Sequence, residues 1–544
     1  MSLSSLLCAG KAASLTSYFS VAYLGILLPV DVIIYSILPQ RFRRYFLLVL
    51  SYVFFWLISG NLLIFLILST LSIHYVGIWL DALIRQRDER VKEVSKEERK
   101  ALKGQYLKKQ RLVVLLAVVI NLGILLVLKY TAFFTTNINS LLEVMNIPVV
   151  LEIPEFIMPI GISFYTMQAI SYVMDVYHGV IKAEYNLGKL ALYMNFFPQI
   201  VEGPICRYSE TADKLWNVEK IKFDNLKFGL QRILYGLMKK LVIVDRLNPL
   251  IKEIFTNYDK YEGGVILIGA VCYTCQLYMD FSGSMDAVMG TAQIFGITMP
   301  ENFKQPFFSR SISEFWKRWH ITLGAWFKDY IFYPVTMSKP MKNITSAARK
   351  KIGNHFGPLI AGSIALFCVW ISNGLWHGSA WSYIFFGMYH FVLILGGNII
   401  EPYVKKLNKL LHINTEFFAY RAFQMIRTGF LVVIGELFFR ANGLRAGLTM
   451  FKRMITDFSF KTVSEELVLK LGIDMYDVII VIITVAIVFV ISVLREKGIS
   501  VRKGIDKKNI VIRWAILYAL IIFIVICGAY GRGYIPIDPM YANF

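Results

Sequence analysis

Long apolar runs recur along the whole sequence and are separated by short polar stretches. Each run holds roughly 18 to 22 residues, about the length that an α-helix needs to cross ~30 Å of hydrocarbon. The pattern therefore predicts an all-α, polytopic helical membrane protein. The predicted single or paired spans lie at Tyr18–Leu38, Tyr45–Leu80, Leu112–Phe134, Phe156–Tyr177, Phe356–Asn398, Phe418–Phe438, Val478–Leu494 and Ile510–Ala529.

Composition and charge agree with a membrane protein and exclude an ordinary soluble one. The 544 residues are 56% hydrophobic, with a mean hydropathy of +0.55. A net charge of +21 would point to nucleic acid in a soluble chain, but here Lys and Arg gather in short segments between the apolar runs. That distribution marks cytoplasmic loops, so we expect no nucleic-acid partner. The basic segments are Gln40–Arg44, Arg85–Arg111, Lys339–Lys351 and Arg495–Lys508.

One apolar segment is too irregular for a full crossing. Leu190–Tyr208 carries two prolines, a glycine and a glutamate, so it favours a re-entrant element. Irregular backbone is tolerated at membrane depth only where protein or a water-filled cavity satisfies its polar groups. We therefore expect re-entrant elements around a central tunnel.

A histidine interrupts the apolar pair Phe356–Asn398 in the stretch "ISNGLWHGSAW", which runs from Ile371 to Trp381. Because the flanks on both sides are basic, the turn at about Trp376 to Ala380 is expected to face outward. An ionisable residue at membrane depth is a functional hypothesis by default, which singles out His377. A neutral imidazole there suits removal of a proton from a hydroxyl that attacks an activated acyl carbon.

The neighbours of His377 have expected roles of their own. Gly374 and Gly378 leave room for backbone or substrate to approach, and Trp376 and Trp381 are expected to wall the site. The other histidines, apart from His320, lie at predicted span ends or in loops, where an interfacial or solvated ring is the simpler interpretation. These are His74, His178, His355, His390 and His412.

A second unusual segment, Gln305–Val335, is too charged to cross lipid. At helical spacing Trp316, His320, Leu323 and Phe327 share one face, and charged residues surround them. We expect this segment to lie against the cytoplasmic side, with His320 pointing into the interior.

Metal and acid–base alternatives are weak. The six cysteines are scattered and no second pair complements Cys272 and Cys275, so we expect no metal site and no disulfide framework. Asp280 and Asp286 are six residues apart and would face different directions on one helix, which favours structural or tunnel-lining roles over an acid–base pair.

Several blocks together give the chain a specific resemblance. It resembles the membrane-bound O-acyltransferase superfamily, in particular the bacterial branch with the alginate O-acetyltransferase membrane subunit and the teichoic acid D-alanyl transfer protein. The blocks occur in family order up to about residue 445. They are Pro159–Tyr177, Phe196–Tyr208, Tyr278–Ile297, Asn302–Val335, "NGLWHGSAW" (Asn373–Trp381) and "FFRA" (Phe438–Ala441).

The resemblance implies a multi-pass enzyme of a bacterial cell membrane whose tunnel joins a cytoplasmic thioester donor to an outer acceptor. It places the catalytic role on His377 and a donor-side role on His320. Residues 1–445 would form the acyltransferase core, and 446–544 an extension with two further spans and an extracytoplasmic tail. The residues expected to line the tunnel or the substrate are Trp316, Trp319, Asn373, Trp376, Gly378 and Trp381.

The expected reaction moves acetyl from acetyl-CoA towards a cell-surface or exported polysaccharide. We expect no permanently bound cofactor. An extracytoplasmic acyltransferase or esterase-like partner is expected to complete the transfer. D-alanyl transfer from a carrier-protein thioester to teichoic acid stays open. In the tail "DPMYANF", Tyr541 resembles a tyrosine of related proteins or their partner peptides, which implies a residue that carries the acyl group as an ester. The alternative is a tail that only packs against the outer surface. A transporter or flippase would predict inverted repeats, which the two halves do not show. A scaffold for an export complex would need neither histidine.

Overall fold

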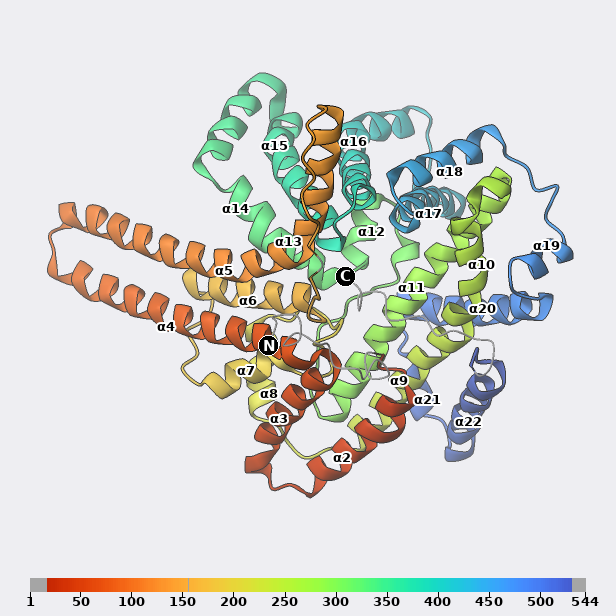
Figure 1. The fold of residues 1–544 in the computed structure, drawn as a ribbon, viewed down its shortest axis with the longest axis horizontal. Coiled ribbons are helices and arrows are strands. Elements are labelled where there is room, and N and C mark those ends of the chain that lie inside the picture. The colour runs from red at the N-terminus through yellow and green to blue at the C-terminus, as the bar shows by residue number, and fades with distance from the viewer. Residues whose placement is uncertain (1–16, 155, 531–544) are drawn as a thin grey trace. The chain divides into compact units, whose positions relative to one another are not determined.

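The computed structural model describes residues 17–154 and 156–530, and within these ranges every regular element is a helix (Figure 1). The prediction of an all-α protein is confirmed for this part of the chain. The elements are η2 (Ala22–Leu27), α2 (Leu28–Ile37), α3 (Gln40–Ser59), η3 (Gly60–Leu62), α4 (Leu63–Glu93), α5 (Lys96–Val144), α6 (Ile162–Tyr177), α7 (Leu187–Asn195), α8 (Tyr208–Trp216), α9 (Phe223–Met238), η4 (Lys239–Val244), α10 (Asp245–Thr256), η5 (Tyr258–Lys260), α11 (Gly263–Ile294), η6 (Pro306–Phe308), α12 (Ile312–Arg318), α13 (Ile321–Phe327), η7 (Lys328–Phe332), α14 (Tyr333–Thr336), α15 (Lys339–His377), α16 (Trp381–Leu410), α17 (Phe418–Arg440), α18 (Leu444–Thr456), α19 (Glu465–Lys470), α20 (Met475–Glu496), α21 (Val501–Asp506) and α22 (Ile510–Cys527).

Eight helical segments in the described residues are long and apolar enough to cross a membrane. Two predicted spans correspond to shorter helices: Ala22–Ile37, before Gln40, and α6 (Ile162–Tyr177). The eight segments are Gln40–Glu93, Lys96–Val144, Gly263–Ile294, Lys339–His377, Trp381–Leu410, Phe418–Arg440, Met475–Glu496 and Ile510–Cys527.

The chain divides into two compact units. Among the described residues, unit 1 comprises 17–154, 156–230 and 288–300, and unit 2 comprises 231–287 and 301–530. The proposed division into a core (1–445) and an extension (446–544) follows the family resemblance and not the contacts, so it stays a prediction.

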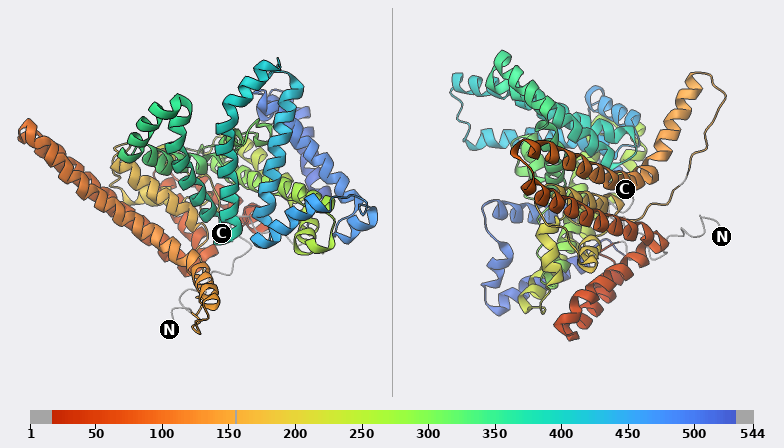
Figure 2. Two further views of the ribbon diagram at one scale, coloured as in Figure 1. Left: turned by 90° about the horizontal axis from the view of Figure 1, so that it is seen from above. Right: turned by 90° about the vertical axis from the view of Figure 1, so that its left-hand side faces the viewer.

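In unit 1, α4 and α5 run side by side and α6 packs on both (Figure 2). The basic segment Arg85–Arg111 was expected as a loop, but the structure corrects this to two helix ends joined by a tight turn. Its Lys, Glu, Arg and Ala residues are strong helix formers. Ser95 and Glu98 form a reciprocal capping box that starts α5 at the turn.

The segment between α7 and α8 is irregular and fully enclosed. Every residue from Leu190 to Cys206 is buried, although the helix ends at Asn195. Side chains satisfy part of this backbone: Phe197 N–H donates to Ser51 Oγ (3.1 Å), and Tyr18 Oη donates to the carbonyl of Phe197 (3.2 Å). The prediction that Leu190–Tyr208 is not a plain span is confirmed.

In unit 2, α15 and α16 form the predicted pair, joined at Gly378–Ala380. Glycines let the two helices approach closely: a Cβ on Gly374 would lie 2.5 Å from the carbonyl oxygen of Tyr383, and one on Gly387 would lie 2.3 Å from that of Trp370. At its other end α15 folds back on itself at Gly353, whose φ is +82°. Such a conformation favours glycine.

Unit 2 also encloses a group of paired charges. Asp286 accepts from Arg232 Nε (2.9 Å) and from Lys239 Nζ (2.7 Å), and all three side chains are buried. Asp280 pairs separately with Lys240 (3.0 Å). The two aspartates therefore face different partners, as their spacing predicts, and serve as structural counter-ions.

We predict that Asp286→Ala lowers the free energy of unfolding by about 3–5 kcal/mol, because it leaves buried cations without their shared carboxylate. Thermal unfolding of the purified protein in detergent measures the loss. The control is Glu466→Ala, which removes an exposed pair with Lys470 and should leave the transition in place. An unshifted transition in Asp286→Ala would contradict the desolvated ion cluster.

Candidate active site

The two histidines singled out by sequence meet at one tryptophan. The ring centroid of Trp376 lies 5.6 Å from that of His320 and 4.9 Å from that of His377. Both imidazoles are buried, with exposed fractions of 2% and 5%. Trp376 is buried as well, so one indole contacts both imidazoles inside the protein.

His377 is the last residue of α15, and the packing around the helix end determines where its ring points. Its ring contacts Phe386 and Phe439, at centroid distances of 5.9 and 5.0 Å. Gly378 follows with an extended backbone, and a Cβ there would lie 2.3 Å from the ring of Tyr383. The glycine therefore permits an aromatic ring to close over the helix end, as expected for a residue that leaves room.

His320 lies at a break between two short helices, not on one continuous helix. α12 ends at Arg318 and α13 begins at Ile321, and His320 between them has a left-handed backbone (φ +44°, ψ +53°). The expectation that Trp316, His320, Leu323 and Phe327 share one helical face is therefore wrong. Non-glycine residues rarely adopt this conformation, and helical periodicity cannot reveal it.

Asn302 determines the tautomer of His320. Its Oδ1 lies 3.2 Å from His320 Nδ1 and also accepts from the Thr322 amide (3.1 Å) and hydroxyl (3.0 Å). An atom that accepts from an amide N–H is the carboxamide oxygen, so Nδ1 of His320 must be the donor. The neutral ring then carries its lone pair on Nε2. Burial lowers the pKa of His320 to about 3, which keeps the ring uncharged near neutral pH.

The other expected lining residues divide between the interior and the surface. Trp319 is buried against Tyr278, Phe303 and Phe315, and Asn373 is buried on α15. Trp316 is half-buried on α12. Trp381, in contrast, is 55% exposed at the start of α16. Its role as a wall stays a prediction, as does the role of Tyr541, which lies outside the described residues.

Two further histidines, His390 and His74, are buried and were not predicted to be. His390 is 0% exposed, so the interpretation as an interfacial or solvated ring is wrong, and the same holds for buried His74. His390 Nδ1 accepts from Trp316 Nε1 (3.2 Å), and its ring stacks on Trp370. The sequence did contain a signal for the burial of His390. Phe386, His390 and Ile394 recur at four-residue intervals, and all three lie on one buried face of α16.

A cavity of about 430 Å³ adjoins the His377 side of the site. Phe439, which contacts His377, forms part of its wall together with Tyr383, Arg440 and Asn442. A volume of this size accepts a small organic ligand. Arg440 was passed over although it stands in the quoted block "FFRA" at the outward end of a predicted span. Among the described residues, no group of three His, Cys, Asp or Glu side chains is arranged to hold a metal ion.

The arrangement can support proton transfer between neutral groups. Buried imidazoles, one with a defined tautomer, are neutral and carry the lone pair that a general base needs. The adjacent cavity has room for a small hydroxyl-bearing molecule, and Phe439 lies between its space and the ring of His377.

We predict that His320 stays neutral and protonated on Nδ1 from pH 5 to 8, because its pKa lies far below this range. Nitrogen NMR of ¹⁵N-histidine-labelled protein measures this, with His320→Gln to assign the signal. Asn302→Ala should remove the tautomer preference, whereas Thr322→Val, which loses only another donor to the same oxygen, should preserve it. A midpoint near 6.5 in the wild type would contradict the buried environment.

Comparison with known proteins places this site in a family. The membrane-bound O-acyltransferase family matches residues 180–349. A probable alginate O-acetylase of Pseudomonas syringae pv. tomato is 31% identical over 440 residues, covering 81% of this chain and 75% of its own length.

Two other relatives show how far the similarity extends. The peptidoglycan O-acetyltransferase of Helicobacter pylori is 28% identical over 64% of this chain and 65% of its own length. The teichoic acid D-alanyltransferase of Bacillus subtilis is 32% identical over 45% of this chain and 60% of its own length. The chain belongs to the membrane-bound O-acyltransferase family and is a multi-pass membrane O-acyltransferase.

Proposed function

We propose that this enzyme moves an acetyl group from cytoplasmic acetyl-CoA across the membrane for O-acetylation of a cell-surface or exported polysaccharide. The observation that carries the proposal is the pair of buried imidazoles on one indole, with a cavity beside His377. Relatives named as O-acetylating enzymes match most of the chain, which supports acetyl as the acyl group.

In the proposed reaction His377 acts as general base. The acceptor hydroxyl gives its proton to the imidazole while its oxygen forms a bond to the thioester carbonyl carbon. The carbon–sulfur bond then breaks, and the thiolate leaves with the proton that His377 returns. Neutral His320 offers the Nε2 lone pair on the donor side, where it positions the thioester or the leaving thiol.

A tunnel between donor and acceptor is part of the proposal. The tunnel itself follows from the family resemblance, and within unit 1 the buried irregular segment, which we interpret as re-entrant, is compatible with a polar interior. There Asn195 is 0% exposed and its amide atoms have no hydrogen-bond partner among the described residues, and the same holds for Gln199 Oε1. Unsatisfied buried amides are costly unless water or a ligand reaches them.

The acceptor side involves a partner in this proposal. The cavity beside His377 combines aromatic rings with Arg440 and Asn442, which suits a polar hydroxyl-bearing group. An extracytoplasmic acyltransferase or esterase-like partner would collect the acetyl group there and pass it to the polysaccharide. Transfer of D-alanine from a carrier-protein thioester is the second candidate, supported by the local 32% identity to a teichoic acid D-alanyltransferase.

We predict that His377→Ala lowers transfer of radiolabelled acetyl from acetyl-CoA by about 10²–10⁴-fold, the range for loss of a general base. The assay uses purified protein with its cognate partner. His412→Ala, at an exposed ring after α16, is the matched control and should keep full activity. Transfer only from a D-alanyl carrier protein would overturn the acetyl assignment, and full activity of His377→Ala would overturn the catalytic role.

We also predict that Tyr541 carries the acetyl group as an ester during turnover. Mass spectrometry of the chain after incubation with acetyl-CoA should locate an added acetyl on the C-terminal peptide. Tyr541→Phe should abolish both the modification and transfer to the partner, because the phenyl ring lacks the hydroxyl. Unimpaired transfer by Tyr541→Phe would show that the tail carries no acyl group.

A further inference from the structure

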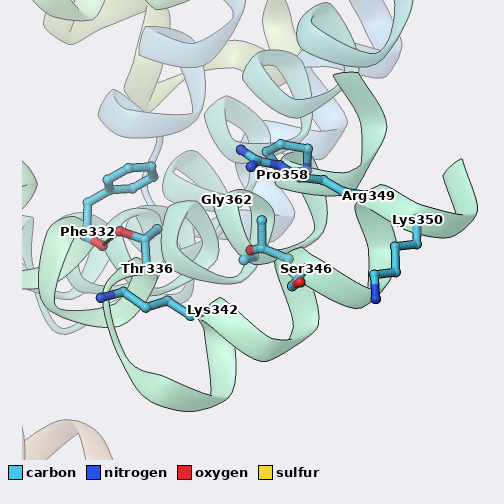
Figure 3. Close-up of a pocket in the computed structure, with 10 residues that line it drawn as sticks. Phe332, Thr336, Lys342, Ser346, Arg349, Lys350, Pro358 and Gly362 are labelled. Atoms are coloured by element: carbon cyan, nitrogen blue, oxygen red, sulfur yellow. Dashed lines mark hydrogen bonds between the residues drawn. The ribbon is translucent and has the colours of Figure 1, made fainter. Parts of the chain in front are cut away.

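A second cavity in unit 2, of about 580 Å³, lies where α15 folds back on itself (Figure 3). Lys342, Arg349 and Lys350 contribute to its lining from the first arm of α15, and Pro358 and Gly362 from the second arm. Close contact holds the fold in place, since a Cβ on Gly357 would lie 2.6 Å from the Cα of Arg349.

The charged side chains that line this cavity are all positive. Three exposed cations line it, Lys342, Arg349 and Lys350, and neither aspartate nor glutamate is among the lining residues. The hydroxyls of Thr336 and Thr345 donate to backbone carbonyls one turn earlier, so the cations are the donors that face a ligand. Cations with no acid among them suit phosphate oxygens.

The position of the cavity also fits the donor side. The basic segment Lys339–Lys351 is predicted to be cytoplasmic from its charge. From Gly362, at the cavity, α15 runs about 22 Å to His377 at the helical rise. One helix thus links a basic cavity at its cytoplasmic end to the imidazole at its other end.

We propose that this cavity binds the phosphate groups of the thioester donor, which rests on the proposed acyl transfer from CoA. The phosphates remain at the cytoplasmic end among Lys342, Arg349 and Lys350. The linear pantetheine arm carries the thioester away from them towards the histidines. An anionic phospholipid headgroup offers the same phosphate chemistry and is the alternative source.

Binding of two probes tests the assignment without any need for transfer. Titration calorimetry on the purified full-length protein in phosphatidylcholine nanodiscs compares CoA with pantetheine, which lacks phosphate. The variant Lys342→Gln/Arg349→Gln should weaken CoA binding by about tenfold or more. It should leave pantetheine binding unchanged. Arg349→Lys should retain much of the affinity, because it keeps the charge.

Lys406→Gln is the matched control. It removes an exposed cation at the cytoplasmic end of α16, away from the cavity lining, and should leave CoA affinity unchanged. Equal effects of the cavity variant on both probes would overturn the proposal. So would unchanged CoA affinity combined with lost retention of phosphatidylglycerol in native mass spectrometry, which would assign the cavity to a lipid headgroup.

The outcome also separates this inference from the proposed function. Phosphate-dependent CoA binding by a protein that transfers no acetyl would support the cavity assignment and overturn acetyl transfer. Acetyl transfer by cavity variants whose CoA affinity is unaltered would support acetyl transfer and overturn the cavity assignment.

Discussion

An α-helix that ends inside the protein governs the geometry of this site. α15 stops at His377 because Gly378 turns away from the helix, and Tyr383 of the next helix closes over that turn. The close packing of α15 on α16 depends on glycines that face backbone carbonyls, so a side chain at Gly374 or Gly387 would force the two helices apart. Trp376, one residue before the helix end, presents its indole to both imidazoles. The placement of His377 is thus a consequence of the close approach of two helix backbones.

Unit 2 contains two kinds of buried titratable side chain: paired ions and neutral imidazoles. One group of buried charges in unit 2 is paired: Asp286 joins Arg232 and Lys239, and Asp280 joins Lys240. Where chemistry is expected, the titratable groups are imidazoles among aromatic rings, and burial keeps His320 neutral. A neutral base escapes the desolvation penalty of a buried ion and remains available for a proton. The two kinds of group lie close together, because His320 contacts Phe281 on α11, the residue that follows the paired Asp280.

Much of the fold could be predicted from the sequence, because span-length apolar runs and basic segments are direct signals of membrane helices. The pair around Gly378, the span ending at Phe438 and the two late spans were all found in this way. Three features were not. His320 lies at a left-handed break within a segment that helical periodicity predicts to be continuous helix. His390 is buried by neighbours that are distant in sequence. The charged segment near Ser95 was expected as a loop, but its residues are strong helix formers and it is helical. Each depends on backbone conformation or tertiary packing, which a hydropathy pattern does not encode.

The C-terminal helices contribute to the same unit as the histidines. Arg246, just after η4, pairs with Asp477 at the start of α20 and donates to the carbonyl of Cys527 at the end of α22 (2.6 Å). At the other end of α20, Glu496 pairs with Arg318 (2.8 Å). Arg318 lies two residues before His320 in the sequence. Phe489 stacks on Phe308 between these anchors. α20 is therefore tied to the segment that carries the left-handed turn at His320. A region predicted from the sequence to be an extension therefore packs in the structure against the segment that carries His320.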